Sequence, residues 1–415
     1  MTADKMRDEE IEVTDLPVLD DAVQDVEEFG PRYEQPLPSA LPPREFKPWH
    51  RPRKQFVRRT QWVQSFNKLV EDVLHADPSR RVFGYIGLPG NDLIDVRLFA
   101  DVCSMRGRKL AYLGFDRAAG DAEVDGLYLN LARDELLKSG KAHRSSIVLR
   151  DEFSMLGETS SLAYKQANNA SYDVVNLDLC GSATNMPAGG SGTLYKALEN
   201  LLHIQERREE PWLLLLTATF DRAGQSSVGL ENVERIYLPL REDLNRCPDA
   251  KKKVLEVLAL ENQGDLPDLE SCDDEAYSLL HVLSFVSWFS RIARSVRPAH
   301  VKCTSIMAYR LHKGRPCPDM FSLAIRINPH PRAIVDSARL LPMPKMMPGS
   351  ETRDCAALDQ QVARLGKVKD VDGHLVENKE LFIEVRDETA DILEALRYDK
   401  AGYLASRYSK HIDDT

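Results

Sequence analysis

Short apolar runs alternate with longer amphipathic segments between Arg81 and about Leu240. The runs are RVFGYIGL, KLAYLGFD, SSIVLRDEF, DVVNLDL and WLLLLTATF, and segments such as LIDVRLFADVCSMRG separate them. Runs of this length are typical of strands, and the segments carry apolar residues at helical spacing. Strands that alternate with helices predict a parallel sheet with both faces covered. We therefore expect an α/β fold with a doubly wound, mostly parallel, Rossmann-like sheet.

The same pattern divides the chain into four predicted parts. Residues 1–43 are acidic, contain prolines and show no periodicity, which predicts a disordered acidic tail. Residues 44–80 combine a basic and aromatic arm with one helix, and residues 81–245 are expected to form the Rossmann-like domain. Residues 246–415 are expected to form a smaller C-terminal α+β domain, in which HVKCTSIMAYRLHKGRPCPDMFSLAIRINPH predicts a hairpin.

Composition limits the class of protein. The chain has 415 residues, of which 43% are hydrophobic and 29% charged, and its net charge is −10. No apolar run approaches the roughly 18 residues that cross a bilayer, and the N-terminus lacks the pattern of a signal peptide. The seven cysteines form no CxxC pair and no cluster with metal-ligand spacing. These features predict a cytoplasmic protein with reduced thiols, no membrane segment and no metal site.

Glycines mark the first strand-to-helix junction, FGYIGLPGNDLIDVRLF. Gly84, Gly87 and Gly90 are spaced G-x-x-G-x-x-G, which differs from the dinucleotide pattern G-x-G-x-x-G and from a phosphate loop. Small residues at such a turn let a ligand approach the backbone near a helix N-terminus. A tight turn alone also favours glycine, so a cofactor-binding role and a purely structural role both stay open.

Carboxylates follow the second and third predicted strands. Asp116 ends AYLGFD, where an acid can accept hydrogen bonds from ribose hydroxyls. Asp151, or Glu152 beside it, ends VLRDEF and would lie near the adenine of a nucleoside across the sheet edge. The alternatives are a solvated turn for Asp116 and a helix-capping role for the acids after the third strand.

The fourth predicted strand ends in a carboxylate, in the stretch YDVVNLDLCGS. By alternation, Asn176 and Asp178 share one face with Val174. In an open α/β sheet, ligands lie outside the carboxyl ends of the strands. Asp178 could there accept a hydrogen bond from an exocyclic amine, or take its proton, with Asn176 as its polar partner. We select Asp178 and Asn176 as candidate catalytic residues.

A basic and aromatic segment, PPREFKPWHRPRKQFVRRTQW, precedes the sheet. Cations can contact phosphates, and rings can stack on unstacked bases, so one interpretation is a nucleic-acid-binding arm. A second is an arm that wraps the domain with its aromatic rings buried and its cations on the surface. A third is a docking peptide for an acidic partner or for the protein's own acidic N-terminus. The candidate nucleic-acid contacts are Arg51, Arg53, Lys54, Arg58, Arg59, Trp49 and Trp62.

These pieces in this order resemble class I S-adenosylmethionine-dependent methyltransferases. YDVVNLDLCGSA with LLLLTATF resembles the catalytic and following strands of tRNA guanine-N2 dimethyltransferases, and YIGLPG resembles the glycine turn of three-Cys-motif partner proteins. The resemblance covers Arg81 to about Leu240. It implies S-adenosylmethionine as cofactor, with Gly84, Gly87 and Gly90 at the methionine end, Asp116 on the ribose and Asp151 at the adenine. It also implies that Asp178 faces the group to be methylated.

Two departures from the family pattern keep other functions open. The acid usual before the glycine turn is absent, and Leu179 and Cys180 replace the proline and aromatic residue after the catalytic aspartate. The first hypothesis is methyl transfer to nucleic acid. The second is a catalytically inactive subunit that binds partner proteins, a nucleotide or nucleic acid in a bacterial multi-protein complex, such as a defence complex. The third is a sensor of an adenosine-type ligand.

Overall fold

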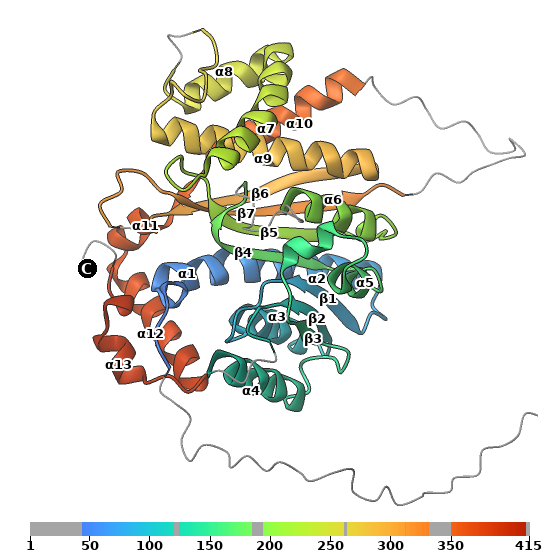
Figure 1. Ribbon diagram of the computed structural model, residues 1–415, viewed down its shortest axis with the longest axis vertical. Coiled ribbons are helices and arrows are strands. Elements are labelled where there is room, and N and C mark those ends of the chain that lie inside the picture. Colours follow the sequence, from blue (N-terminus) through green and yellow to red (C-terminus); the bar gives the residue numbers. More distant parts are fainter. Residues whose placement is uncertain are drawn as a thin grey trace, which may run out of the picture. The chain divides into compact units, whose positions relative to one another are not determined.

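Eight strands form one sheet in the order β3-β2-β1-β4-β5-β7-β6-β8 (Figure 1). The computed structural model describes residues 44–119, 124–184, 194–260, 264–311, 313–331 and 350–411. The tail predicted for residues 1–43 lies outside these residues. The strands are β1 (Val82–Gly87), β2 (Lys109–Phe115), β3 (Ile147–Leu149), β4 (Val174–Ser182), β5 (Trp212–Thr219), β6 (Ala299–Tyr309), β7 (Met320–Pro329) and β8 (Lys369–Asp370).

Strands β3, β2, β1, β4 and β5 are parallel neighbours. This order places strands on both sides of β1, as in the doubly wound fold. Strand β7 runs antiparallel between β5 and β6, and β8 pairs with β6 in parallel. The predicted α/β class with a mostly parallel, Rossmann-like sheet is therefore confirmed.

The segment expected to form a separate C-terminal domain extends this sheet. Strands β6 and β7 form the predicted hairpin, and β7 pairs with β5 along the whole length of β5, from Trp212 to Thr219. Hydrogen bonds of the sheet thus continue past the predicted boundary at residue 245, and Pro43–Thr415 form one compact unit. An open edge on the fully buried strand β5 would leave backbone groups unpaired, and the hairpin supplies their partners.

Helices cover both faces of the sheet (Figure 1). Alternate residues of each central strand belong to different cores: Val174, Leu213 and Leu215 pack with α2 and α3, whereas Val175 and Leu214 pack with α6, α7 and α9. The helices are α1 (Pro52–Val57), α2 (Gln64–Ala76), α3 (Ile94–Ser104), α4 (Val124–Lys138), α5 (Leu162–Ala167), α6 (Leu194–Gln205), α7 (Ser227–Arg246), α8 (Pro248–Val257), α9 (Asp274–Val296), α10 (Ser350–Leu365), α11 (Val371–Glu377), α12 (Lys379–Ala395) and α13 (Lys400–Ala405).

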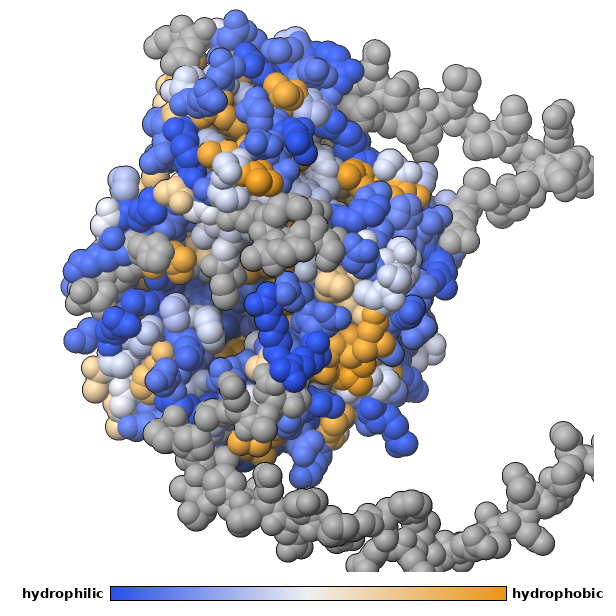
Figure 2. All heavy atoms as spheres, in the orientation of Figure 1, coloured by the Kyte–Doolittle hydropathy of each residue, from blue (hydrophilic) through white to orange (hydrophobic). Residues whose placement is uncertain are grey.

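Shorter turns connect these elements. A π-helical turn, Arg58–Val63, joins α1 to α2, so the basic and aromatic segment continues as one helical stretch. Single 3-10 turns occur at Pro48–His50, Phe153–Gly157 and Arg407–Ser409. Among the described helices, none has an apolar stretch that is long enough to cross a membrane. Figure 2 shows hydrophilic side chains over most of one face, with separate groups of hydrophobic residues.

A buried acid fixes the beginning of β4. Asp173 is fully buried and pairs with Arg208 at 2.5 Å and with Arg80 at 3.0 Å. Its carboxylate also accepts the Gly84 backbone N–H at 2.6 Å. Two cations and a backbone donor compensate the desolvation of this charge. Asp173 is therefore a structural carboxylate that ties β1 and the end of α6 to β4.

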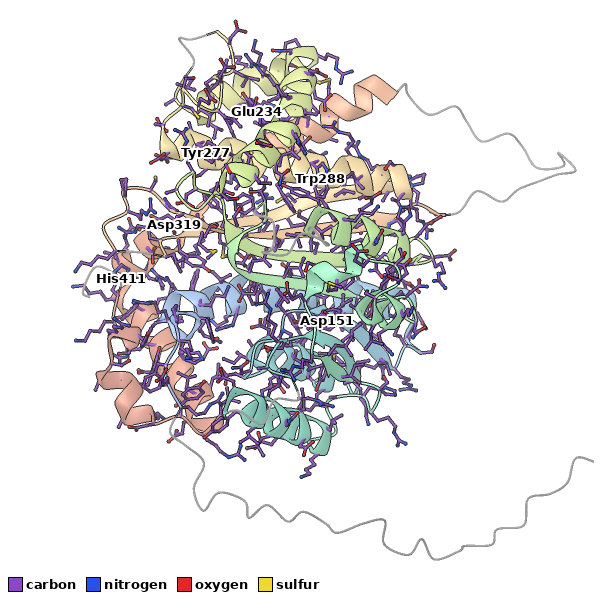
Figure 3. All side chains as sticks on the ribbon, viewed as in Figure 1. Asp151, Glu234, Tyr277, Trp288, Asp319 and His411 are labelled. Carbon is purple, nitrogen blue, oxygen red and sulfur yellow. A yellow bond between two sulfur atoms is a disulfide. The ribbon has the colours of Figure 1, made fainter. Side chains whose placement is uncertain are left out.

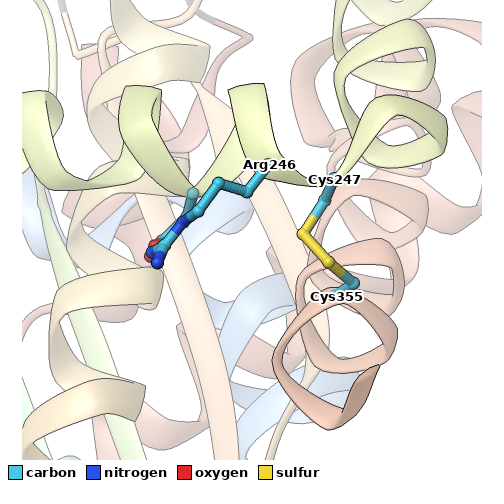
Figure 4. Close-up of a disulfide and its surroundings, with 4 residues drawn as sticks. Arg246, Cys247 and Cys355 are labelled. Carbon is cyan, nitrogen blue, oxygen red and sulfur yellow. A yellow bond between two sulfur atoms is a disulfide. The ribbon is translucent and has the colours of Figure 1, made fainter. Parts of the chain in front are cut away.

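A disulfide joins Cys247, just after α7, to Cys355 in α10 (Figure 4). The Cα atoms are 5.5 Å apart and 108 residues apart in sequence. The expectation of reduced thiols is therefore wrong for these two residues. Because the helices that carry them are brought together only by the fold, no local spacing indicates the pair. Among described residues, Cys103, Cys272, Cys303 and Cys317 are free.

Candidate functional site

One cavity of about 820 Å³ opens at the carboxyl ends of β1, β2, β3 and β4. One wall consists of residues at the carboxyl ends of these strands or just after them. The facing wall comes from α1, the π-helical turn that follows it and the adjoining ends of β6 and β7. Asp151, labelled in Figure 3, lies below β4 in that view. The strand-end wall includes Leu88, Pro89, Gly90, Asp116, Asp151 and Asp178, and the facing wall includes Arg53, Lys54, Arg58, Tyr309 and Met320.

The three glycines of the first junction have different positions. Gly90 lines the cavity and has a φ of 62°, in the left-handed region where a side chain is strained. Gly87 lies at the end of β1, where a Cβ atom would come within 2.0 Å of the Asn176 carbonyl oxygen. Gly84 lies inside β1, where a Cβ atom would come within 2.8 Å of the Ser171 carbonyl oxygen. Gly84 and Gly87 therefore allow close backbone packing, and only Gly90 belongs to the cavity wall.

The carboxylates after β2 and β3 face the same cavity. Asp116 Oδ1 accepts the Ala118 backbone N–H at 2.8 Å, and burial raises the pKa of this carboxyl group. Asp151 Oδ1 accepts the Glu152 backbone N–H at 2.8 Å. Each carboxylate thus retains acceptor capacity beyond its local turn. Glu152 pairs with Arg117 at the rim.

Asp178 in β4 forms an ion pair with a lysine from the N-terminal segment. Lys54 Nζ lies 2.5 Å from Asp178 Oδ1 and 3.4 Å from the Tyr309 hydroxyl. It also lies 4.6 Å from the centroid of the Trp62 ring. Burial lowers the pKa of Lys54, but the charge of Asp178 and the neighbouring Tyr309 more than offset this, so the pKa is raised. Lys54 therefore remains protonated at neutral pH and donates to Asp178 Oδ1.

Asn176 lies behind this pair rather than in the cavity wall. Its side chain is fully buried, and Nδ2 donates to Asp95 Oδ2 at 3.1 Å. Asp95 Oδ1 accepts from Arg58 Nε at 2.8 Å, and Arg58 also donates to the Trp49 carbonyl oxygen at 3.0 Å. Burial raises the pKa of Asp95, although Arg58 opposes this effect. Asn176 thus supports a buried polar network beside Asp178.

Asp92, in the glycine turn after β1, contacts residues near both ends of the described chain. Asp92 pairs with Arg44, accepts from the Tyr398 hydroxyl at 3.1 Å and lies 3.0 Å from His50 Nε2. The Lys47 backbone N–H donates to His50 Nδ1, so the Nε2 proton points to Asp92. Burial lowers the pKa of His50 despite Asp92, which agrees with this neutral ring.

The basic and aromatic segment packs into the protein. Arg53, Lys54 and Arg58 are buried in contact with acids of distant segments, and Arg59 pairs with Glu384 and Glu388 of α12. Trp62 is 1% exposed, and its indole N–H donates to Ser322 Oγ at 3.0 Å. Arg51 stacks on Tyr408, and Trp49 is partly buried at the cavity. This arrangement corresponds in part to the arm that wraps the domain. The Trp62 ring is buried as that interpretation predicts, but the prediction of surface cations is wrong for Arg53, Lys54 and Arg58, because each pairs with an acid in the interior.

Sequence reasoning missed Asp92, Asp95 and Tyr309. The two acids follow Gly90 closely in GNDLID. The sequence could therefore have indicated two carboxylates near the start of α3, beside the glycine turn. Tyr309 reaches the cavity only because β7 and β6 join the sheet beyond β5. No local pattern indicates that contact. Within the described residues, no group of histidine, cysteine, aspartate and glutamate side chains is arranged to hold a metal ion.

Comparison with known proteins identifies a family rather than an activity. The comparison with curated proteins gives no match. A family model described as PP_RS20740-like matches residues 43–408, which include every element of the cavity. The description names no substrate, cofactor or partner. Because the match covers most of the chain, this protein belongs to the PP_RS20740-like family.

Proposed function

We propose that the cavity binds S-adenosylmethionine and that the protein is a methyltransferase that acts on an exocyclic amine of nucleic acid. The observation that carries this proposal is the convergence of Gly90, Asp116, Asp151 and Asp178 on one cavity at the strand ends. These four residues were selected from a resemblance to class I methyltransferases, in which such positions contact the cofactor and the acceptor.

The side chains of the cavity fit an adenosyl group. Asp116 and Asp151 offer carboxylate oxygens for hydroxyl and amine donors, and Leu88, Phe115 and Phe153 supply apolar surface for a ring. Six acids and four basic side chains line the cavity, so its net charge favours a cationic sulfonium ligand. When bound, the cofactor supplies an activated methyl group.

The chain's own groups would position the acceptor. Asp178 Oδ1 is paired with Lys54, and Oδ2 forms no hydrogen bond or ion pair with the described residues, so it can accept a hydrogen bond from an amine. Because the Lys54 ammonium group already occupies Oδ1, we assign Asp178 the orientation of the amine through Oδ2. Trp49 and Tyr309 line the same cavity and can stack on a flipped base.

Calorimetry with S-adenosylmethionine and S-adenosylhomocysteine tests the proposal. We expect Asp116→Asn to weaken binding about 10-fold to 100-fold, because ribose hydroxyls lose a charged acceptor. Asp178→Asn should retain cofactor binding but lose transfer of a labelled methyl group to an RNA or DNA pool. The exposed acid Glu231 provides the control variant Glu231→Gln, which should leave both measurements unchanged. No binding of either ligand at millimolar concentration would overturn the proposal.

A second function, a non-catalytic binding subunit, is favoured by one contact. Lys54 blocks one oxygen of Asp178 and is itself 5% exposed, so the pair is built into the fold. In that case the protein would bind an adenosine-type ligand or a partner protein without methyl transfer. Cofactor binding with no transfer to nucleic acid, together with a protein that co-purifies from the native source, would support this alternative.

A further inference from the structure

A basic hollow lies at the amino ends of the parallel strands, whereas the main cavity lies at their carboxyl ends. It has a volume of about 650 Å³ and is formed at the amino ends of β1 and β2, the end of α4 and the segment before β3. We propose that this hollow is a binding site for a phosphate group, presented either by a small nucleotide or by a nucleic-acid backbone. The lining residues are Arg81, Val82, Gly107, Lys109, Leu137, Ala142, His143 and Arg144.

Backbone pairing brings the three cations together. The Lys109 backbone N–H donates to the Arg81 carbonyl oxygen at 3.1 Å, and Leu110 forms a bridge with Ala142, two residues before Arg144. The left-handed Gly107 turn precedes β2 at this edge, with a φ of 64°. The cations therefore come from three adjacent segments of a single sheet edge rather than from one flexible loop.

Charge in the hollow is uncompensated. Arg81, Lys109 and Arg144 are exposed, and the part of the chain that the structure describes gives none of them an ion pair. No acid of the described residues lines the hollow. Neighbouring cations behave differently, because Arg80 pairs with Asp173 and Lys141 pairs with Asp101. In a chain of net charge −10, three unpaired cations around one hollow repel each other, and a bound anion would remove that repulsion.

The size and the lining of the hollow favour a phosphate ester over a smaller anion. Two guanidinium groups can each donate two parallel hydrogen bonds to phosphate oxygens, and the lysine adds a point charge. Val82, Leu137 and Ala142 add apolar surface to the same hollow, where a sugar or base attached to the phosphate can pack. This site is independent of the proposed methyltransferase site, because none of its residues lines the main cavity.

Titration of the full-length protein with pyrophosphate, ADP and a 5′-phosphorylated single-stranded oligonucleotide tests the site. We expect Arg81→Ala and Arg144→Ala each to weaken binding about tenfold, and the triple variant with Lys109→Ala to abolish it. The double variant Arg235→Ala/Lys252→Ala removes exposed cations elsewhere and serves as the control, with unchanged affinity expected. Asp116→Asn should not change the affinity for pyrophosphate, which carries no adenosine for the main cavity, so failure at this site is distinguishable from failure at the main cavity.

Two results separate the sources of the phosphate. An oligonucleotide that binds no more tightly than ADP indicates a small nucleotide, whereas affinity that rises with length and falls steeply with salt indicates a nucleic-acid backbone. Either result supports the site if the triple variant loses it. Binding that the triple variant retains, or that the control variant loses equally, would overturn the proposal. So would the absence of binding by all three ligands at low salt.

Discussion

At the residue scale, burial decides which titratable groups can respond to pH. His281 in α9 is fully buried, and its Nδ1 lies 3.0 Å from the Phe220 carbonyl oxygen. Burial lowers the pKa of His281 to about 4, and the hydrogen bond to Phe220 only partly opposes this. The ring is therefore neutral in the folded protein and donates from Nδ1. It has no exposed surface from which it could exchange protons with a substrate.

This burial predicts a loss of stability in mild acid. The pKa of His281 in the folded protein lies below its ordinary value of 6.5. Between these two pKa values the unfolded chain binds a proton at His281 and the folded chain does not. Between pH 7.5 and 5.0 we expect the unfolding free energy to fall by about 2 kcal/mol more in the wild type than in His281→Gln. Urea unfolding at both pH values measures this difference. Equal losses in the two proteins would contradict the assignment.

Single strand-end acids were predictable from the sequence, and their partners were not. Asp116, Asp151 and Asp178 each follow an apolar run, and parallel strands bring their carboxyl ends to one edge. Lys54 lies 124 residues before its partner Asp178, in a segment for which each interpretation of the sequence predicts cations at the surface. Charge density does not distinguish a solvated cation from one that is paired in the interior.

At the element scale, α1 places the Lys54 ammonium group against side chains of both walls of the cavity. Lys54 contacts Asp178 in β4 and Tyr309 in β6 through one ammonium group. This helix is the first part of the helical stretch that continues into α2, and all six of its residues are buried. Its stability therefore comes from tertiary packing rather than from helix propensity.

Removal of this cation should destabilise the protein through Asp178. We expect Lys54→Met to lower the unfolding free energy by about 1 to 3 kcal/mol, because a mostly buried carboxylate loses its cation. Lys54→Met/Asp178→Asn should recover part of that loss, since no unpaired charge remains. Urea unfolding of the wild type, both single variants and the double variant gives the coupling energy. Strictly additive effects would show that the pair does not act as a unit.

The glycine turn shows how element packing changes the meaning of a motif. Gly84, Gly87 and Gly90 look equivalent in sequence, yet only Gly90 reaches the cavity. At Gly87 the backbone of β4 comes so close that any side chain would force the strands apart. Spacing predicted the turn correctly, but the contact between neighbouring strands is set by three-dimensional register.

At the scale of the whole molecule, one sheet joins segments that the sequence divides into two domains. The apolar pattern predicts each strand of 81–245 and the hairpin of β6 and β7. It does not predict that β7 pairs with β5. A hairpin that joins this sheet and a hairpin in a separate domain would show the same alternation of apolar residues. The wall of the cavity that contains Tyr309 and Met320 depends on that pairing.

The disulfide should stabilise the half of the molecule that contains α7, α8 and α10. It closes a loop with a sequence separation of 108 residues, for which we expect a contribution of about 2 to 5 kcal/mol to the unfolding free energy. Urea unfolding with and without a reductant measures it, and Cys247→Ser/Cys355→Ser should match the reduced protein. Cys317→Ser, at a free cysteine, is the control and should respond to the reductant as the wild type does. Two free thiols found at Cys247 and Cys355 by mass spectrometry of the native protein would contradict the pairing.

The contacts of the N-terminal segment set the order in which a nascent chain can complete its cavity. Arg53 can donate to Asp372 only after Asp372 has been synthesised. The His50 carbonyl oxygen accepts from the Tyr403 hydroxyl, which lies 353 residues later in the chain. During synthesis, the strand-end acids are made long before the residues that hold α1 against them. A ribosome-bound chain that ends before α11 can carry Asp116, Asp151 and Asp178 but lacks these anchors. The cavity wall that α1 forms therefore lacks these anchors until translation has reached the last helices.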